Sequence, residues 1–139
     1  MRAVSPVTRR RIVVGAAVLC GLVAAAGGAA GLAVSRERAD TVARAMTGGD
    51  PERAPDLIRR YGCAGCHTIP GIPGADGQVG PSLDGLRRRV YVGGVALNRP
   101  DDLVWWIVDP QAFSPRSAMP ATGIAEAEAR DVAAYLYAR

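Results

Sequence analysis

The sequence predicts an all-α protein in which one membrane-spanning helix precedes a small helical domain. Residues 12–34 form an uncharged run of 23 residues, which is long enough to cross a bilayer as a helix. Farther along, apolar residues recur at helical spacing, and stretches rich in glycine and proline separate these segments. No segment shows the convincing alternation of apolar and polar residues that is typical of a strand.

Charge divides the N-terminus from the rest of the chain. The formal net charge is +4, from 17 arginines and 13 acidic residues. Residues 1–11 hold four of the arginines and no acid, whereas basic and acidic residues balance at 13 each after Val34. This bias places residues 1–11 in the cytoplasm and everything after Val34 on the far side of the membrane. The excess charge thus reflects topology and gives no reason to expect nucleic-acid binding.

The apolar run at 12–34 has two other interpretations. A cleaved secretory signal would share the basic start and the small residues at 24–30, but the length of the run favours a retained anchor. A lipoprotein signal would need a small residue before Cys20, where the sequence has Leu19. We interpret Cys20 as a small apolar side chain in the membrane. Each of these interpretations exports the rest of the chain.

Residues 35–50 are polar, and we expect them to form a tether that is partly helical through 36–46. The remaining segment, 51–139, has 89 residues and few large apolar side chains. Domains of this size have difficulty burying enough apolar surface. A buried prosthetic group would therefore supply much of the missing core.

The first helix of the domain is expected over 51–61. Asp50 is a suitable N-cap, and Pro51 occupies the first helical position. Three apolar residues lie on one face of this helix: Leu57, Ile58 and Tyr61.

The segment Cys-Ala-Gly-Cys-His at 63–67 is the only CxxCH motif, and His67 is the only histidine in the chain. The motif is typical of covalent haem attachment, in which both thiols bond to the haem and the histidine ligates the iron. One turn of backbone presents Cys63 and Cys66 to neighbouring edges of a flat macrocycle and places His67 beneath its centre. The sequence therefore predicts one haem c, and a second axial histidine from the same chain is impossible.

Two other chemistries use the Cys-x-x-Cys spacing. A thiol–disulfide switch normally lies between a strand and a helix, and no strand pattern is visible here. A zinc site would need a fourth ligand beside Cys63, Cys66 and His67, such as a carboxylate, because no second Cys/His pair exists. Both chemistries remain alternatives to haem.

Beyond the motif, the expected elements alternate with loops. Residues 68–81 are expected to be a loop, because they are rich in glycine and proline, and 83–92 a short helix. A helix over 100–108 has two acids in its first turn and is ended by Pro110. Residues 111–123 are expected to be irregular. The last helix spans 126–138, and its apolar face is formed by Val132, Tyr135 and Leu136.

Met119 is the best candidate for the sixth iron ligand. It lies in the turn-rich segment Ser-Ala-Met-Pro at 117–120, where Pro120 would stiffen the loop and hold the thioether in position. A methionine often serves only to fill a core, but this one does not lie on a helix face. The remaining alternative is an open iron, which would favour ligand binding over electron transfer.

The order and spacing of four segments resemble class I c-type cytochromes with a single haem, here preceded by a membrane anchor. The resemblance spans roughly 48–139. The segments are 61–67, Gly-Pro-Ser-Leu at 80–83, Ala-Met-Pro at 118–120 and the helix containing 131–136. The resemblance implies a fold in which the first and last helices cross near the haem.

The same resemblance implies roles for several further residues. It implies that the Pro81 carbonyl accepts a hydrogen bond from the ligating imidazole, although Pro81 could be only a loop residue. Arg88 or Arg89, with Trp105 or Trp106, would lie near the haem propionates; otherwise they are solvated arginines and a packed aromatic pair. One departure from the family is Ala125, where relatives often have a capping Ser or Thr, and it puts the first turn of the last helix in doubt.

The stretch 79–120 is similar to cytochrome c domains associated with haem–copper oxidases, and to small cytochromes encoded beside such oxidases or membrane dehydrogenases. The expected function is electron transfer between respiratory membrane complexes, without enzymatic activity, small-molecule substrate or nucleic acid. The expected location is the bacterial cytoplasmic membrane, with the haem domain facing the periplasm or the outside. The alternatives are a fixed haem relay in an oxidase or dehydrogenase complex, a gas-binding haem sensor, and a thiol oxidoreductase.

Overall fold

The computed structural model describes the backbone of residues 6–139 and the side chains of residues 19–139. The basic segment expected at 1–11 lies largely outside the described residues. The chain divides into two compact units, residues 1–37 and 38–139.

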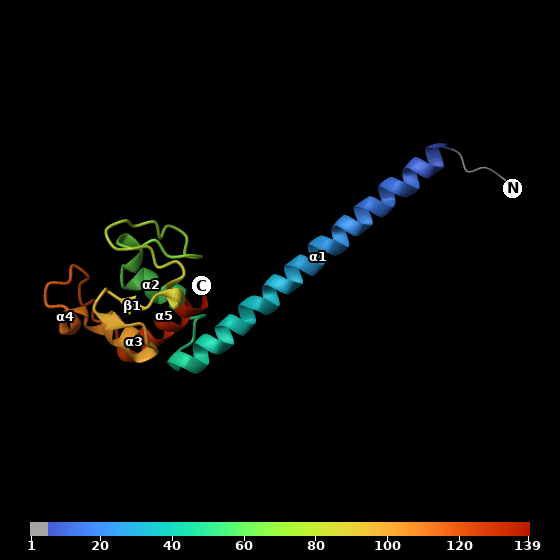
Figure 1. Cartoon of the computed structure of the whole chain (residues 1–139). Helices are drawn as coiled ribbons and strands as arrows, with labels where there is room; N and C mark the ends of the chain where they lie inside the picture. The colour runs from blue at the N-terminus through green and yellow to red at the C-terminus, as the bar shows by residue number, and fades with distance from the viewer. Residues whose placement is uncertain (1–5) are drawn as a thin grey trace. The chain divides into compact units, whose positions relative to one another are not determined.

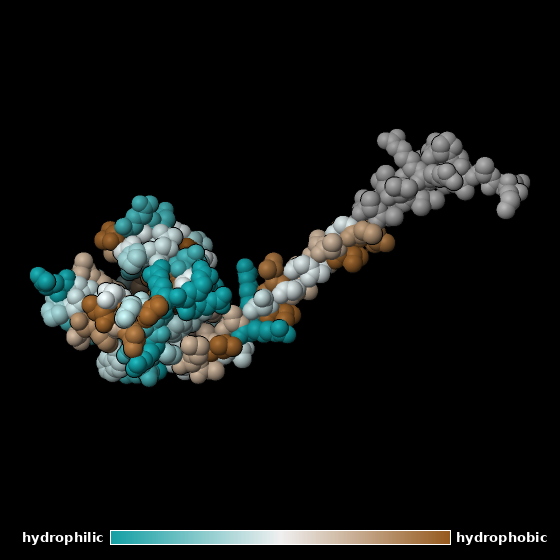
Figure 2. All heavy atoms as spheres, viewed as in Figure 1, coloured by the Kyte–Doolittle hydropathy of each residue, from teal (hydrophilic) through white to brown (hydrophobic). Residues whose placement is uncertain are grey.

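Helix α1 runs without interruption from Pro6 to Thr47 (Figure 1). The run expected to be helical at 12–34 is helical, and so is the segment 36–46. Within the described residues, one stretch, Leu19–Thr47, is long and apolar enough to cross a membrane by length and composition. Its large apolar side chains are exposed, and Figure 2 shows brown, apolar atoms along the described part of this helix.

The last turns of α1 belong to the second compact unit, which begins at Arg38. Ala43 and Thr47 are each 1% exposed, and Ala39 is packed against the same core. These residues follow one another at a spacing of four, so they form one face of the helix. From the sequence, residues 35–50 were expected to be a tether and the domain was expected to begin at 51.

Two polar contacts reinforce this packing at the end of α1. The Arg139 guanidinium donates to Asp40 Oδ1 at 2.7 Å, and Arg130 Nη1 donates to the Thr47 carbonyl at 3.0 Å. Arg130 lies in the last helix of the chain, Glu126–Ala138, and Arg139 directly follows it. The end of α1 is therefore fixed to that helix by small apolar residues and by charge-assisted hydrogen bonds.

Helix α2 spans Ala54–Arg60 and begins three residues later than the sequence analysis expected. The Asp50 side chain does accept a backbone hydrogen bond, from Glu52 N at 3.0 Å, but it closes a turn and not the helix. The physical reason is Pro55. Proline has no N–H, so it cannot make the helical bond to the Pro51 carbonyl, and the helix cannot be regular from 51 onward.

The prediction of a helix over 83–92 is wrong, and one short strand pair forms although the sequence shows no convincing alternation. This region contains one 3₁₀ turn, η2 (Leu86–Arg88), and strand β1 (Tyr91–Val92), which pairs antiparallel with β2 (Ala96–Leu97). Val92 pairs with Ala96 across a turn in which Gly93 and Gly94 both have positive φ, at 56° and 74°. Three residues, 93–95, lie between the paired positions, and Val95 N donates to the Val92 carbonyl at 3.1 Å, so the two glycines are the central residues of a tight turn.

Three helices complete the domain: α3 (Pro100–Val108), α4 (Pro110–Phe113) and α5 (Glu126–Ala138). The bounds of α3 and α5 agree with the sequence analysis, whereas α4 lies where irregular structure was expected. At the start of α5, Ala125 provides no side-chain cap, but its backbone N–H donates to Glu128 Oε2 at 3.4 Å. Glu128 thus supplies one half of a capping box.

The core of the domain is centred on α5, which packs against α2 and α3. All residues from 131 to 138 are buried, not only the face that the sequence analysis named. One of them is an acid, Asp131, whose Oδ1 accepts from Asp50 N at 2.7 Å while Oδ2 lies 3.2 Å from Arg53 Nη1. α5 is therefore enclosed because the end of α1 and the following turn cover the side that α2 and α3 leave open.

Candidate haem site

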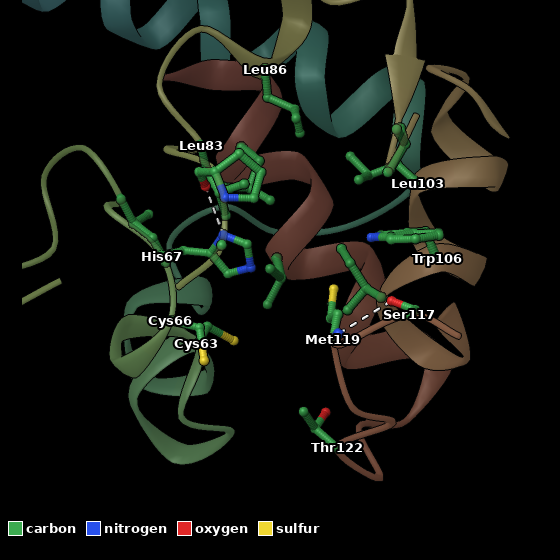
Figure 3. A pocket seen from close by; sticks show the side chains of 18 of the residues that line it. Cys63, Cys66, His67, Leu83, Leu86, Leu103, Trp106, Ser117, Met119 and Thr122 are labelled. Carbon is green, nitrogen blue, oxygen red and sulfur yellow. Dashed lines mark hydrogen bonds between the residues drawn. The ribbon is translucent and has the colours of Figure 1, made fainter. Parts of the chain in front are cut away.

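The domain contains a cavity of about 480 Å³. This volume lies in the range of roughly 300–1,000 Å³ that is typical of cofactor and small-molecule sites. Most of its wall is apolar, with side chains from α2, α3 and α5 that include Ile58, Leu103, Ile107, Val132 and Leu136. Figure 3 shows the polar and sulfur-bearing residues that project into it from three directions.

The cysteine motif forms a tight turn on one wall. Cys63–Gly65 is a 3₁₀ turn, η1, and the backbone N–H groups of Cys66 and His67 both donate to the Cys63 carbonyl, at 3.2 and 3.0 Å. This turn brings both thiols to the cavity, which Cys63, Cys66 and His67 all line. The two cysteines form no disulfide.

Burial raises the pKa of the Cys63 thiol above its ordinary value. Thiol–disulfide switches depend on a lowered cysteine pKa, because the thiolate is the nucleophile. The environment of Cys63 therefore does not favour the thiol oxidoreductase alternative. For the zinc alternative, no group of three or more His, Cys, Asp or Glu side chains is arranged to hold a metal ion among the residues that the structure describes.

The His67 imidazole is held by the loop that follows the motif. Its Nδ1 lies 2.7 Å from the Pro81 carbonyl oxygen. Because a carbonyl can only accept, Nδ1 carries the proton and Nε2 is left with a free lone pair. This hydrogen bond also strengthens the imidazole as a metal ligand.

Gly80 allows the loop to approach the imidazole closely. A Cβ on Gly80 would lie 2.7 Å from His67 Nδ1 and 2.9 Å from Nε2, which is closer than real Cβ contacts come. The Gly80 N–H also donates to the Cys66 carbonyl at 2.8 Å. This backbone hydrogen bond fixes the loop to the cysteine motif at the place where the loop lies against the His67 imidazole.

Met119 lies on the other side of the cavity, in the loop between α4 and α5. Figure 3 shows its side chain across the cavity from His67, with the two cysteines near His67 on the other side. Its backbone N–H donates to Ser117 Oγ at 3.2 Å. An imidazole nitrogen and a thioether sulfur thus approach one apolar space from opposite directions.

Only one arginine and one tryptophan of the neighbouring pairs at 88–89 and 105–106 line the cavity. Arg89 and Trp106 line the cavity, whereas Arg88 and Trp105 are exposed residues that do not. The Arg89 guanidinium donates to the carbonyls of Ser82, by a short contact, and of Asp84, at 3.3 Å. It therefore brings a positive charge to the cavity without being paired to a carboxylate among the described residues.

Asn98 is a residue that the sequence analysis missed. Its amide donates to the carbonyls of Leu86 and Arg89, at 2.8 and 2.9 Å, and its Oδ1 accepts from the Tyr137 hydroxyl at 2.8 Å. These bonds tie the turn that carries Arg89 to helix α5. Burial, together with the charge of Asp102, raises the pKa of Tyr137 to about 12. Tyr137 therefore stays protonated at neutral pH, as its hydrogen bond to Asn98 requires.

Tyr61 connects the start of the cysteine motif to α5. It lines the cavity, and its hydroxyl donates to Glu128 Oε2 at 2.6 Å. This hydrogen bond holds the pKa of Glu128 below its ordinary value, and Arg60, with Nη1 3.2 Å from Oε1, acts in the same direction. The carboxylate thus stays ionised and keeps Tyr61 in place against the cavity.

The residues present fit a covalently bound haem. Two thiols lie at the edge of a mostly apolar cavity, an oriented imidazole and a thioether face each other across it, and a cation lies at its wall. Soft sulfur and imidazole are the axial ligands of iron in c-type cytochromes.

Comparison with known proteins gives one clear result. The family model described as Cytochrome c matches residues 52–138, which is more than half of the chain and contains every cavity residue discussed above. No curated protein and no solved structure matches the chain significantly. The chain therefore belongs to the cytochrome c family, whose members carry covalently bound haem c and transfer electrons.

Proposed function

We propose that this protein is a membrane-anchored electron carrier with a single haem c. In this proposal Cys63 and Cys66 would form the two thioether links, and His67 and Met119 would ligate the iron. The observation that carries it is the arrangement of His67 and Met119 on opposite sides of one apolar cavity, with both thiols at its edge. Pro81 orients the imidazole through the 2.7 Å contact with Nδ1.

The haem, when bound, supplies an iron that cycles between the ferric and ferrous states by outer-sphere transfer. The residues of the chain determine how easily it does so. The soft Met119 sulfur favours the ferrous state, and the apolar wall disfavours the more highly charged ferric state, so both raise the reduction potential. The Pro81 carbonyl acts in the opposite direction, because it makes the imidazole more basic. With His67 and Met119 both bound to the iron, no position on it would be left for a substrate.

The anchor in this proposal is helix α1, which crosses the bacterial cytoplasmic membrane once and leaves the haem domain on the periplasmic or outer side. The uncharged run at 12–34 within this helix and the arginines directly before that run support this topology. The partners are membrane redox complexes such as a haem–copper oxidase or a dehydrogenase. Tethering raises the effective concentration of the haem domain towards such partners.

A second candidate is a fixed haem relay inside an oxidase or dehydrogenase complex. It is favoured by the end of α1, because packing of residues 38–50 into the domain leaves only residues 35–37 between the apolar run and the compact unit. A free shuttle would profit from a longer tether. Purification in mild detergent separates the two: a relay subunit co-purifies with its complex in fixed proportion, and a free carrier elutes alone.

The ligand assignment is tested with Met119→Ala in the fully matured protein. Ferric iron bonded to a methionine sulfur has a weak absorption band in the red. We expect this band in the unsubstituted protein and its loss in the variant, together with the appearance of carbon monoxide binding to the ferrous form. Survival of the band in Met119→Ala would show that another group is the ligand. Strong carbon monoxide binding by the unsubstituted protein would instead support the gas sensor.

A further inference from the structure

The loop that carries Met119 has little structure of its own. It runs from the end of α4 at Phe113 to the start of α5 at Glu126. Its backbone contributes one turn, in which Ser117 N donates to the Ser114 carbonyl at 2.9 Å, and Met119 N donates to Ser117 Oγ. Both of these bonds lie within the loop, so neither fixes Met119 relative to the rest of the domain.

Gln111 supplies the connection between this loop and the helical part of the domain. Its Nε2 donates to the Met119 carbonyl at 2.7 Å and to the Ser117 carbonyl at 3.3 Å. An amide NH₂ has two donors, so both are used on the same turn of the loop. Among the described residues, no other side chain outside the loop makes a hydrogen bond to the stretch 115–123.

Gln111 is itself firmly held, because α4 is fixed at both ends. The Asp109 carboxylate accepts from Ala112 N at 3.2 Å and caps the helix, and Pro110 at its first position is fully buried. At the other end, the Phe113 ring packs on the Trp106 ring of α3, with 6.1 Å between the ring centroids. A four-residue helix anchored in this way is a fixed base from which the Gln111 side chain reaches the loop.

We infer that Gln111 is the positioning residue for the sixth iron ligand. By holding the Met119 carbonyl, it keeps the loop in the conformation in which the thioether faces the cavity and opposes dissociation of the sulfur from the iron. This inference rests on the proposed function, because it requires Met119 to be a ligand. Gln111 touches neither the cavity nor His67, so it acts only through Met119.

The size of the effect follows from the two hydrogen bonds. A hydrogen bond contributes a net factor of roughly twofold to tenfold to an equilibrium. Loss of both bonds should therefore raise the fraction of molecules in which Met119 has left the iron by about tenfold or more. Carbon monoxide binds to ferrous iron only in those molecules, so its apparent affinity should rise by the same factor.

The test compares Gln111→Leu with Gln78→Leu in the full-length, haem-loaded protein in detergent. Gln78 is the only other glutamine in the chain, and it is exposed in the loop before Pro81. Haem content and the main haem absorption are measured first, and then the red methionine–iron band and the carbon monoxide affinity. We expect Gln111→Leu to lose part of the band and to bind carbon monoxide about tenfold more tightly, and Gln78→Leu to match the unsubstituted protein.

A second variant, Gln111→Glu, keeps the size of the side chain and removes its donors, so it covers the case in which leucine prevents folding. If either haem-loaded Gln111 variant retains the full band and the original carbon monoxide affinity, the inference is overturned while methionine ligation stands. If the unsubstituted protein itself lacks the band, the ligand assignment fails and this inference fails with it. Equal losses in the Gln78 and Gln111 variants would also count against a specific role for Gln111.

Discussion

At the scale of single residues, the absence of a side chain at Gly80 is a tight constraint on the site. We predict that Gly80→Ala destabilises the haem-loaded domain by about 1–3 kcal/mol, the usual cost of overpacking, because its Cβ would overlap the His67 ring. The measurement is denaturant unfolding followed by haem absorption. Gly65→Ala is the matched control, since nothing lies within 4 Å of a Cβ at Gly65 in the same motif. Equal stability of the two variants would refute this role of Gly80.

The raised pKa of Tyr137 predicts that the stability of the domain depends on pH. Its pKa is about 12 in the folded domain and about 10 when exposed. Between these values the unfolded chain has lost the hydroxyl proton and the folded chain still holds it, so the free energy of unfolding should fall as the pH rises from about 10 towards 12. We expect Tyr137→Phe to lose this part of the slope, and Tyr91→Phe, at a tyrosine that is 55% exposed, to keep it. An unchanged slope in Tyr137→Phe would contradict the buried Tyr137–Asn98 contact.

The residues of the site differ in how far the sequence alone could identify them. Cys63, Cys66 and His67 lie within five consecutive residues, so their chemistry is visible as a local pattern, and Met119 stands out as a candidate because of its proline-flanked turn. Asn98 and Gln111 bond mainly to backbone carbonyls of other segments. A carbonyl is present at every residue, so no sequence pattern marks which one is the acceptor.

At the scale of elements, the end of α1 is the main difference between expectation and structure. Ala43 is 1% exposed in the core, whereas Ala45 lies on the exposed side of the same turn. We predict that Ala43→Leu destabilises the haem-loaded domain by about 1–3 kcal/mol through overpacking, and that Ala45→Leu changes little, because leucine and alanine have similar helix propensities. Thermal unfolding of the full-length protein in detergent measures both. If Ala43→Leu left the thermal stability unchanged, residues 38–50 would be a free tether.

Local patterns predicted the long elements well and the short ones poorly. α3 and α5 were located correctly, because each has a marked start and enough turns to show an apolar face. The hairpin was missed, since a strand of two residues is too short to show alternation. The Gly93–Gly94 pair between valines was the available signal for its turn. The late start of α2 was also foreseeable in principle, from Pro55.

At the scale of the whole molecule, the domain is built around the space that the haem is proposed to fill. Its three main helices contribute apolar side chains to the wall of the cavity as well as to the core. A small domain buries too little of its own surface to be robust. The prosthetic group is therefore expected to complete the core as well as to carry the electron, which explains how so few large apolar residues suffice.

The most direct test of this account is mass spectrometry of protein purified from cells that contain the haem-attachment machinery. Trypsin cleavage after Arg60 and Arg87 releases residues 61–87, which hold both thiols of the motif. The account predicts that this peptide carries the mass of one haem and that neither Cys63 nor Cys66 reacts with an alkylating agent. A peptide of unmodified mass, with both cysteines open to alkylation, would contradict it.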